Sequence, residues 1–441
     1  MPNRCEAWPY VEPVAITDVY RQRRKVGWDP AAEMIRLTGG AMRRRAFLQC
    51  AATGAMMASG PPASPAPLVA DPATRADWTQ RWERYILNSA RDRRCDTETG
   101  EEVGWLVSPY LGGFYYGYLA TRQEKWIEML VDWADSWIAR AVKEPDGFPG
   151  WPKVNPNGHE DGLYGDSMLG EAMALGPVVM ASAEILKTPA LKRKWGTQAR
   201  KYLDLSLRLF EKWEARGCWR ETANGGLWVE AAFGIDRQTG QWTPDYTDRN
   251  SGGFSHPDNK ENAIADWMLA MYDVTGKSVY RDRSASWFRL MRLRMKLRDG
   301  GKYFVWNYWE PAGAWDYKSD GSTKHWVGVH PNGGYYSIDV NAIVAVFEHG
   351  LGFTKEDIGR LIATNRDFMW NQEARGARFQ RIDGGPADPR WSNSPGVLWS
   401  ALARYDSTLR AIFLANHNPG SWSGMTTTPW ALSQTLPAAY F

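Results

Sequence analysis

The sequence predicts an all-α chain folded as a toroid of paired helices, an (α/α)6 or (α/α)7 barrel. Three observations support this fold class. Apolar residues recur three or four positions apart through most of the chain after Ala73, as in amphipathic helices. Strand-like alternation is scarce. Long loops rich in Gly, Pro and Asn separate the helical stretches, and no repeat of roughly 30–40 residues indicates a solenoid.

The helical stretches can be assigned in order along the chain. Trp126, Leu130, Trp133 and Trp137 show the helical spacing well, and the stretch 203–213 repeats it. The other expected helices lie near 75–93, 107–121, 165–186, 261–274, 278–296, 336–350, 355–370 and 396–415. The segment "KYFVWNYW" (302–309) is the main candidate for a short β-hairpin, which we expect at the mouth of the cleft.

The N-terminal region has the pattern of an export signal. Arg44 and Arg45, followed by Phe47, Leu48 and a weakly apolar stretch, resemble a twin-arginine signal. We therefore expect an unstructured upstream extension at 1–41, a signal peptide with a Pro-rich linker at 42–72, and a catalytic domain at 73–441. This organisation implies a periplasmic or secreted protein. The apolar run of the signal is too short to span a membrane.

Composition narrows the class of partner. Apolar residues form 44% of the 441 residues, so a large core is expected. The formal net charge is only +3, which argues against nucleic acid as a partner. The 25 tryptophans suit both core packing and stacking on sugar rings. We expect a carbohydrate-binding cleft in a monomer or weak dimer, with Cys95 and Cys218 either bridged or, the reading we favour, free and buried.

Cofactor chemistry finds little support in the sequence. The histidines and cysteines lack metal-ligand spacing, and phosphate-loop, dinucleotide and serine-nucleophile motifs are absent. No cofactor or catalytic metal is therefore expected. A structural cation such as calcium, held by loop carboxylates such as Asp161 and Asp166, remains an alternative.

Two reactions fit the remaining polar clusters. A glycoside hydrolase needs a pair of carboxyl groups, one of them protonated. The candidates for such a pair are Asp161, Asp166, Glu171, Asp258, Glu261, Glu310, Asp316 and Asp339. β-Elimination from a uronic acid instead needs a neutralised substrate carboxylate, a base for the C5 proton and an acid for the departing O4. The segment from Lys302 to Tyr336 is rich in Tyr, His, Lys and Asn, the residue types that such a lyase uses.

The order of these residues resembles (α/α)-barrel alginate and glucuronan lyases, polysaccharide lyase families 5 and 38. Those families place an Asn-His pair at a helix start, then an Arg, and a catalytic Tyr six or seven positions after the Arg. The resemblance implies that His256 corresponds to the His, Lys302 to the Arg and Tyr308 to the Tyr. Ser255 stands where these lyases have Asn, and Lys302 lacks the planar fork of an Arg.

The resulting expectation is an exported lyase acting on a uronate polymer. His256 and Tyr308 are the first catalytic candidates, and His330 with Tyr336 is the reserve pair. The substrate-binding candidates are Lys302, Asn250, Asn307, Trp306, Trp309, Trp315, Trp326, Asn332, Tyr335, His159 and Tyr164. The alternatives are a glycoside hydrolase on the same fold and a non-catalytic periplasmic carbohydrate-binding protein.

Overall fold

The computed structural model describes residues 65–159, 162–243, 252–387 and 398–437. The expected signal peptide and upstream extension, as well as Asn250 and Asp161, lie outside these ranges. Leu68 and Val69, which the sequence places in the linker, are 1% exposed and belong to the main hydrophobic core. The packed part of the chain therefore includes residues before Ala73.

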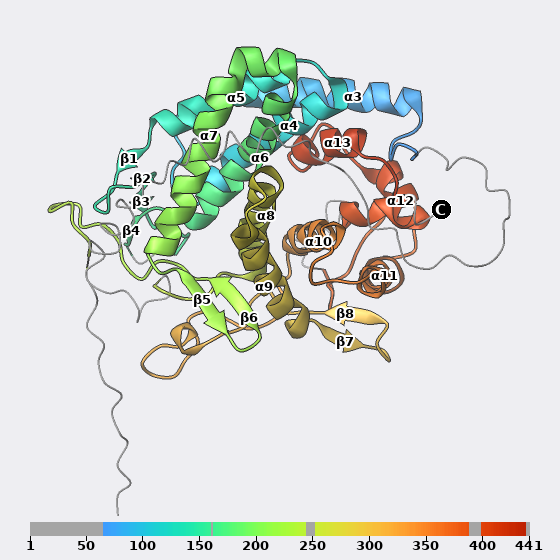
Figure 1. Cartoon of the computed structure of the whole chain (residues 1–441). Helices are drawn as coiled ribbons and strands as arrows, with labels where there is room; N and C mark the ends of the chain where they lie inside the picture. The colour runs from blue at the N-terminus through green and yellow to red at the C-terminus, as the bar shows by residue number, and fades with distance from the viewer. Residues whose placement is uncertain (1–64, 160–161, 244–251, 388–397, 438–441) are drawn as a thin grey trace, which may run out of the picture. The chain divides into compact units, whose positions relative to one another are not determined.

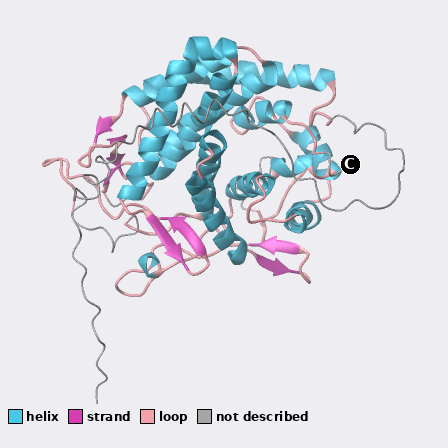
Figure 2. Cartoon of the chain, viewed as in Figure 1, coloured by secondary structure: helices cyan, strands magenta, loops and turns pink. Residues whose placement is uncertain are grey.

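The described chain is mostly helical (Figures 1 and 2). Its longer helices are α3 (Pro72–Ser89), α4 (Ser108–Thr121), α5 (Lys125–Ala139), α6 (Met168–Lys187), α7 (Pro189–Ala215), α8 (Asp258–Thr275), α9 (Ser278–Arg294), α10 (Gly333–Glu348), α11 (Lys355–Ala363), α12 (Ser407–Asn416) and α13 (Gly424–Ser433). Short 3-10 helices span Ala90–Asp92, Arg94–Asp96, Ala314–Asp316 and Ser400–Arg404, and π-helical turns span Val103–Val107 and Thr364–Met369.

Local capping explains several helix boundaries. The Asp71 carboxylate accepts hydrogen bonds from the backbone N–H groups of Ala73 and Thr74, and Pro72 occupies the first helical turn of α3. Asp406 caps α12 in the same way, at 2.8 Å from the Leu409 nitrogen. This cap divides the single helix expected at 396–415 into a 3-10 helix and α12. The sequence analysis missed α13, which contains Pro429.

The helices pack in an order that is consistent with the expected toroid. Helices α4, α6, α8 and α10 contact one another in succession, and α13 packs back against α4. Helices α5, α7 and α9 alternate with this series along the chain (Figure 1). Each of them packs against the helices of the series that precede and follow it or against one of these. Alternation of two helix sets is what a barrel of helix pairs requires.

Four two-stranded antiparallel hairpins complete the described structure. They pair β1 (Val142–Lys143) with β2 (Pro149–Gly150), β3 (Lys153–Val154) with β4 (Tyr164–Gly165), β5 (Trp219–Thr222) with β6 (Gly225–Trp228), and β7 (Lys296–Arg298) with β8 (Tyr303–Val305). In Figure 2 these strands lie at the edges of the helical body. The hairpin expected from 302–309 is present, but its strand ends at Val305 and its partner precedes it.

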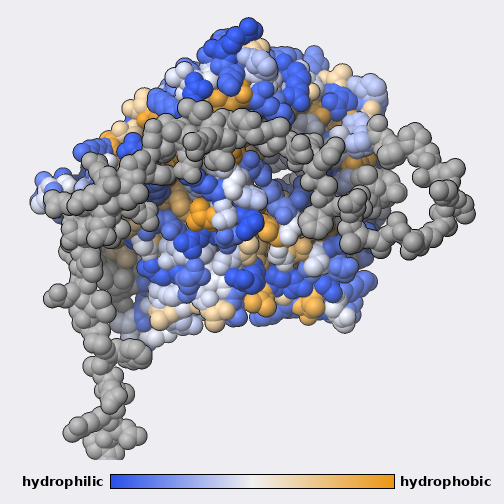
Figure 3. Space-filling view, viewed as in Figure 1, coloured by the Kyte–Doolittle hydropathy of each residue, from blue (hydrophilic) through white to orange (hydrophobic). Residues whose placement is uncertain are grey.

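Tryptophan serves mainly as core. The largest fully buried side chains among the described residues are all tryptophans, on helices, hairpins and loops. The face seen in Figure 3 is largely hydrophilic, with small separate hydrophobic patches. Helix α6 is long and apolar enough to cross a membrane, but 61% of its apolar window is buried, and it packs on α4, α7 and α8 as a core helix does.

A buried ion network joins α6 and α7 to the β1–β4 segment. The Lys212 ammonium lies 2.5 Å from an oxygen of Asp166 and 2.5 Å from one of Glu171, and Arg216 pairs with Asp166 at 2.9 Å. Asp166 therefore already has two protein cations. Within the described residues no group of three His, Cys, Asp or Glu side chains is arranged to hold a metal ion.

Candidate functional site

His256 lies just before α8 and is completely buried. An isolated bridge between Val229 and Ser255 holds this segment against the strand end that carries Glu230. The His256 Nδ1 atom lies 3.0 Å from Glu230 Oε1. Burial lowers the pKa of His256, but the Glu230 carboxylate outweighs it and the net pKa is raised. His256 is thus a buried imidazole with a raised pKa beside a carboxylate, not the accessible base that the sequence suggested.

Lys302 does not join this site. It is exposed at the turn of the β7–β8 hairpin, with its Nζ atom 4.9 Å from the centre of the Tyr303 ring. Tyr308 lies beyond the end of β8, where its N–H donates to the Gly328 carbonyl and its carbonyl accepts from the Asp258 N–H. Lys302 thus lies at the hairpin turn, whereas Tyr308 lies beside the start of α8, although the two residues are only six positions apart. The expected Lys302–Tyr308 pairing is wrong.

Tyr308 instead belongs to a cluster of rings from the segment 308–335, called here the aromatic cluster. Its ring centre lies 4.8 Å from that of His330, 5.3 Å from Tyr335, 5.7 Å from His325 and 5.7 Å from Trp326. Trp326 is 45% exposed and is nearly parallel to Tyr308, at 16°. The cluster thus combines two imidazoles, two phenols and an exposed indole face.

Hydrogen bonds assign different tautomers to the two imidazoles. His325 Nδ1 lies 3.1 Å from the Trp326 carbonyl oxygen, which can only accept, so Nδ1 carries the proton and Nε2 the lone pair. His330 Nδ1 accepts from the Asn332 N–H at 2.9 Å, so its proton lies on Nε2. Burial lowers the pKa of both residues, which keeps both rings neutral at neutral pH. His325 is therefore the candidate base and His330 a donor.

Tyr308 has the properties of an acid, not of a base. Burial raises its pKa, and the nearby Tyr335 and Glu101 raise it further. A phenol with a raised pKa stays protonated and can deliver its proton to a leaving oxygen.

Lys260 on α8 is a cation whose charge acts on the aromatic cluster, where it contributes to the lowered pKa of His325. Its ammonium donates to Glu101 Oε2 at 2.7 Å and to the Asn157 carbonyl at 3.4 Å. Burial lowers the pKa of Lys260, but the charges of Glu101 and Glu230 raise it overall, with a further contribution from Tyr335. Glu101, Glu230, His256 and Lys260, called here the charged cluster, form two pairs of a basic and an acidic side chain, and Glu101 and Lys260 also interact electrostatically with Tyr308 and Tyr335.

Sequence reasoning missed four of these residues. Lys260 follows His256 by four positions at a helix start, and this spacing was a usable signal for two side chains on one face. His325 stood in the Tyr- and His-rich segment, but its tautomer depends on a backbone carbonyl. Glu101 and Glu230 come from distant parts of the chain, and no local pattern marks them.

Two of the expected sugar-stacking tryptophans are core residues. Trp306 is 1% exposed and its Nε1 donates to Asp339 at 2.9 Å, while Trp309 is fully buried and donates to the Ser255 carbonyl at 2.8 Å. Trp315 is half-buried and donates to Ser255 Oγ at 3.0 Å. Only an exposed indole can stack on a ligand, so Trp326 alone of the four presents a large free face.

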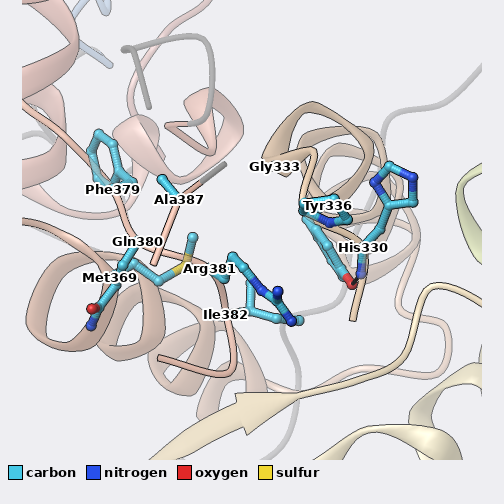
Figure 4. A pocket seen from close by; sticks show the side chains of 10 residues that line it. His330, Gly333, Tyr336, Met369, Phe379, Gln380, Arg381, Ile382 and Ala387 are labelled. Atoms are coloured by element: carbon cyan, nitrogen blue, oxygen red, sulfur yellow. Dashed lines mark hydrogen bonds between the residues drawn. The ribbon is translucent and has the colours of Figure 1, made fainter. Parts of the chain in front are cut away.

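The reserve pair, His330 and Tyr336, does not form an acid–base pair for a substrate. Tyr336 is 1% exposed, and its hydroxyl accepts the His330 N–H at 2.9 Å, so it holds the loop. Figure 4 shows His330 and Tyr336 on one side of a small pocket and Arg381 on the other. Arg381 pairs with Asp383 at 2.6 Å, so its charge is already matched. Tyr336 is therefore a positioning residue and not an acid for a substrate.

The remaining candidates lie around the site. Asn332 caps α10 by accepting the Gly334 N–H, and Asn307 donates to Glu310. His159 packs edge-on against Phe254, which in turn stacks on His325. Tyr164 lies on β4 under the guanidinium of Arg237. His159 is thus connected to the aromatic cluster, whereas Tyr164 belongs to the β3–β4 hairpin.

The described carboxylates considered for hydrolysis are engaged within the protein. Asp166 and Glu171 bind Lys212, Asp258 pairs with Arg294 at 3.3 Å, and Glu310 contacts Asn307. Glu261, Asp316 and Asp339 are at most 2% exposed and accept hydrogen bonds from protein groups. Of these seven carboxylates only Glu310 has the intermediate burial of His325, and the other six are buried.

Comparison with known proteins assigns no family. No family model matches the chain, and no curated protein sequence matches it. Nine chains of solved structures are similar to it. One is a D-mannose isomerase, which is 12% identical with a TM-score of 0.45, over 82% of this chain and 97% of that chain.

Proposed function

We propose that the chain is an exported polysaccharide lyase with an (α/α)-toroid fold that cleaves a uronic-acid polymer by β-elimination. The observation that carries the proposal is the pairing of His325 with Tyr308. The His325 ring is neutral and carries its proton on Nδ1, so the Nε2 lone pair can accept a proton. Its ring centre lies 5.7 Å from that of Tyr308, whose phenol is kept protonated by burial. A base and an acid in one cluster are what β-elimination requires.

In the proposed reaction His325 Nε2 takes the C5 proton of the uronate. The C5–H electron pair forms the C4=C5 double bond, and the C4–O4 bond breaks. The Tyr308 hydroxyl gives its proton to the departing O4, and proton exchange with water restores both groups. The His330 Nε2–H is the donor assigned to the substrate carboxylate, where it offsets part of the negative charge that develops.

The aromatic cluster supports a sugar substrate. The pKa values of His256 and Lys260 are raised by Glu230 and Glu101, so these two side chains are paired within the protein and do not themselves select an acidic ligand. Trp326 supplies an exposed aromatic face next to Tyr308, suited to a sugar ring. A hydrolase is less favoured because the described candidate carboxylates are already bound to protein groups.

The test is incubation of the full-length exported protein with alginate, glucuronan and a neutral glucan. A lyase generates a 4,5-unsaturated end that absorbs ultraviolet light, and a primary isotope effect at C5 would identify the proton that is removed. New reducing ends without ultraviolet absorption would indicate a hydrolase. Binding with neither product would indicate a carbohydrate-binding protein.

Export is part of the proposal and has its own test. Replacing Arg44 and Arg45 with Lys should retain the protein in the cytoplasm, because twin-arginine export depends on that pair. Fractionation of cells that express each form measures the result. Equal export of the two forms would remove the twin-arginine assignment without affecting the proposed reaction.

A further inference from the structure

Helix α3 carries a row of exposed basic and polar side chains outside the candidate site. Arg81, Arg84, Asn88 and Arg91 are three or four positions apart, through α3 and the 3-10 helix that follows it, and all four are exposed. This spacing puts them on one face of the helix. The face is therefore a linear array of three guanidinium groups and an amide.

These residues form one wall of an open groove, called here the α3 groove. Tyr85 and Leu87 lie on the same wall, and Asn418 and Gly420 form the other. The groove has a volume of ≈ 700 Å³, within the roughly 300–1,000 Å³ of ordinary ligand sites. The residues that line it include three cations and no carboxylate.

The charge of the groove is largely unmatched. Arg81 divides its guanidinium between Asp77 at 3.4 Å and Asn418 at 2.9 Å. No ion pair of Arg84 or Arg91 occurs among the described residues. The next two arginines of the chain differ in this respect: Arg93 pairs with Asp96 and Asp132, and Arg94 with Glu98. Arg84 and Arg91 thus line the groove as two guanidinium groups without an ion pair among the described residues.

An exposed aromatic side chain lies near the end of the same row. Trp422 is 44% exposed and meets the Tyr110 ring edge-on, with ring centres 5.9 Å apart. The Tyr110 hydroxyl in turn donates to the carbonyl of Ser89, the last residue of α3. Guanidinium forks bind carboxylates in two-point contacts, and an indole face stacks on sugar rings.

We infer that the α3 groove is a second binding site for an acidic polysaccharide, separate from the catalytic clusters. The identity of the polymer as the substrate rests on the proposed function, whereas binding of an anionic glycan does not. Such a site would retain a long chain at the enzyme between cleavage events and would have no effect on short oligomers. Binding should weaken steeply with salt because exposed charges are screened.

The experiment measures retardation of the protein in native gels that contain alginate, glucuronan or neutral dextran. It uses the His325→Ala background, so that the polymer stays intact. Arg84→Ala with Arg91→Ala should weaken retardation by the anionic polymers at least fivefold. The matched control, Arg193→Ala with Arg200→Ala, removes the same charge from exposed sites on α7 and should leave retardation unchanged.

Three results would overturn the inference: equal retardation of the groove variant and its parent, an equal loss in the α7 control, or no retardation of the parent by either anionic polymer. In the active protein, the groove variant should keep its rate on a tetrasaccharide and lose rate only on long polymer. The ultraviolet product assay is independent of retardation, so failure of the proposed reaction and failure of the groove site are distinguishable.

Discussion

The buried carboxylate of Asp316 binds the residue that precedes His256. Asp316 Oδ1 accepts the Ser255 N–H at 2.7 Å, and Oδ2 accepts the Ser255 hydroxyl at 2.8 Å and the Ala312 N–H at 2.6 Å. Asp316 lies within the segment that carries Tyr308 and His325. The contact therefore joins the aromatic cluster to the start of α8, and Ser255 has a structural task where the resembled lyases have Asn.

This junction predicts coupled losses of stability. Ser255→Ala should lower the free energy of unfolding by about 1–3 kcal/mol, because it removes the hydroxyl from a buried network. Asp316→Ala should cost more, since the N–H groups of Ser255, Ala312 and Gly313 all lose their acceptor. Denaturant unfolding of both variants and of the double variant measures the coupling. The double variant should lose less than the two single losses together; simple additivity would count against the junction.

The pH dependence of the reaction follows from the pKa shifts of the acid and the base. The pKa of His325 is lowered from 6.5 by burial, so the neutral base persists until the pH falls below that value. Burial raises the pKa of Tyr308 above 10, so the acid stays protonated in alkaline solution. We expect kcat/KM to be flat from about pH 7 to pH 9 and to fall only on the acidic side. An acidic limb centred well above pH 6.5 would contradict the assignment of His325.

His256 predicts a pH-dependent term in stability. Its folded-state pKa lies above the usual 6.5, so its stabilising contribution is fully present below pH 6.5 and is lost as the pH rises through the folded-state pKa. Glu230→Gln removes the charge partner and should lower stability by about 3–5 kcal/mol between about pH 4.5 and pH 6.5, where the lowered pKa of Glu230 and the raised pKa of His256 keep both groups charged. The stability difference between wild type and variant should shrink as the pH rises. A difference independent of pH would show that His256 is neutral.

The cysteines predict an unreactive pair of thiols. Cys95 and Cys218 are free and buried, and burial raises the pKa of each to about 12. Neither thiol is a good nucleophile near neutral pH. A thiol reagent should therefore label these two positions only after unfolding, and a reductant should not change the melting temperature. Mass spectrometry of labelled peptides distinguishes them from Cys5 and Cys50; rapid labelling of folded Cys95 or Cys218 would be the contrary result.

The secondary-structure elements can be predicted from this sequence more accurately than the tertiary contacts between them. Helical spacing located α4, α6, α8 and α9 to within a few residues, because periodicity is a local property. Helix α13 was not predicted, because Pro429 interrupts its helical pattern. Helix α12 was predicted as one helix with the preceding 3-10 helix, although the Asp406 cap separates the two. Lys302 precedes β8 and Tyr308 follows it, so the strand separates the two side chains. The bounds of this strand could not be obtained from a spacing of six residues.

The candidate site shows the same limit. Tyr308, His330 and Tyr335 do lie together, as expected from their common segment. The roles of the histidines depend on backbone atoms: the Trp326 carbonyl for His325 and the Asn332 N–H for His330. The carboxylates of Glu101 and Glu230 reach the site only through folding, from segments about 160 and 30 positions away from α8 in the chain. Long-range contacts of this kind have no local signature.

The central claim is that His325 is the base that starts elimination. The most direct measurement is the rate of ultraviolet-absorbing product from a uronate polymer for the wild type, His325→Ala and the surface control Lys302→Ala, each checked for an unchanged melting temperature. The account predicts a loss of about 10²–10⁴-fold for His325→Ala and no change for Lys302→Ala. A His325→Ala variant that forms the unsaturated product at the wild-type rate would contradict it.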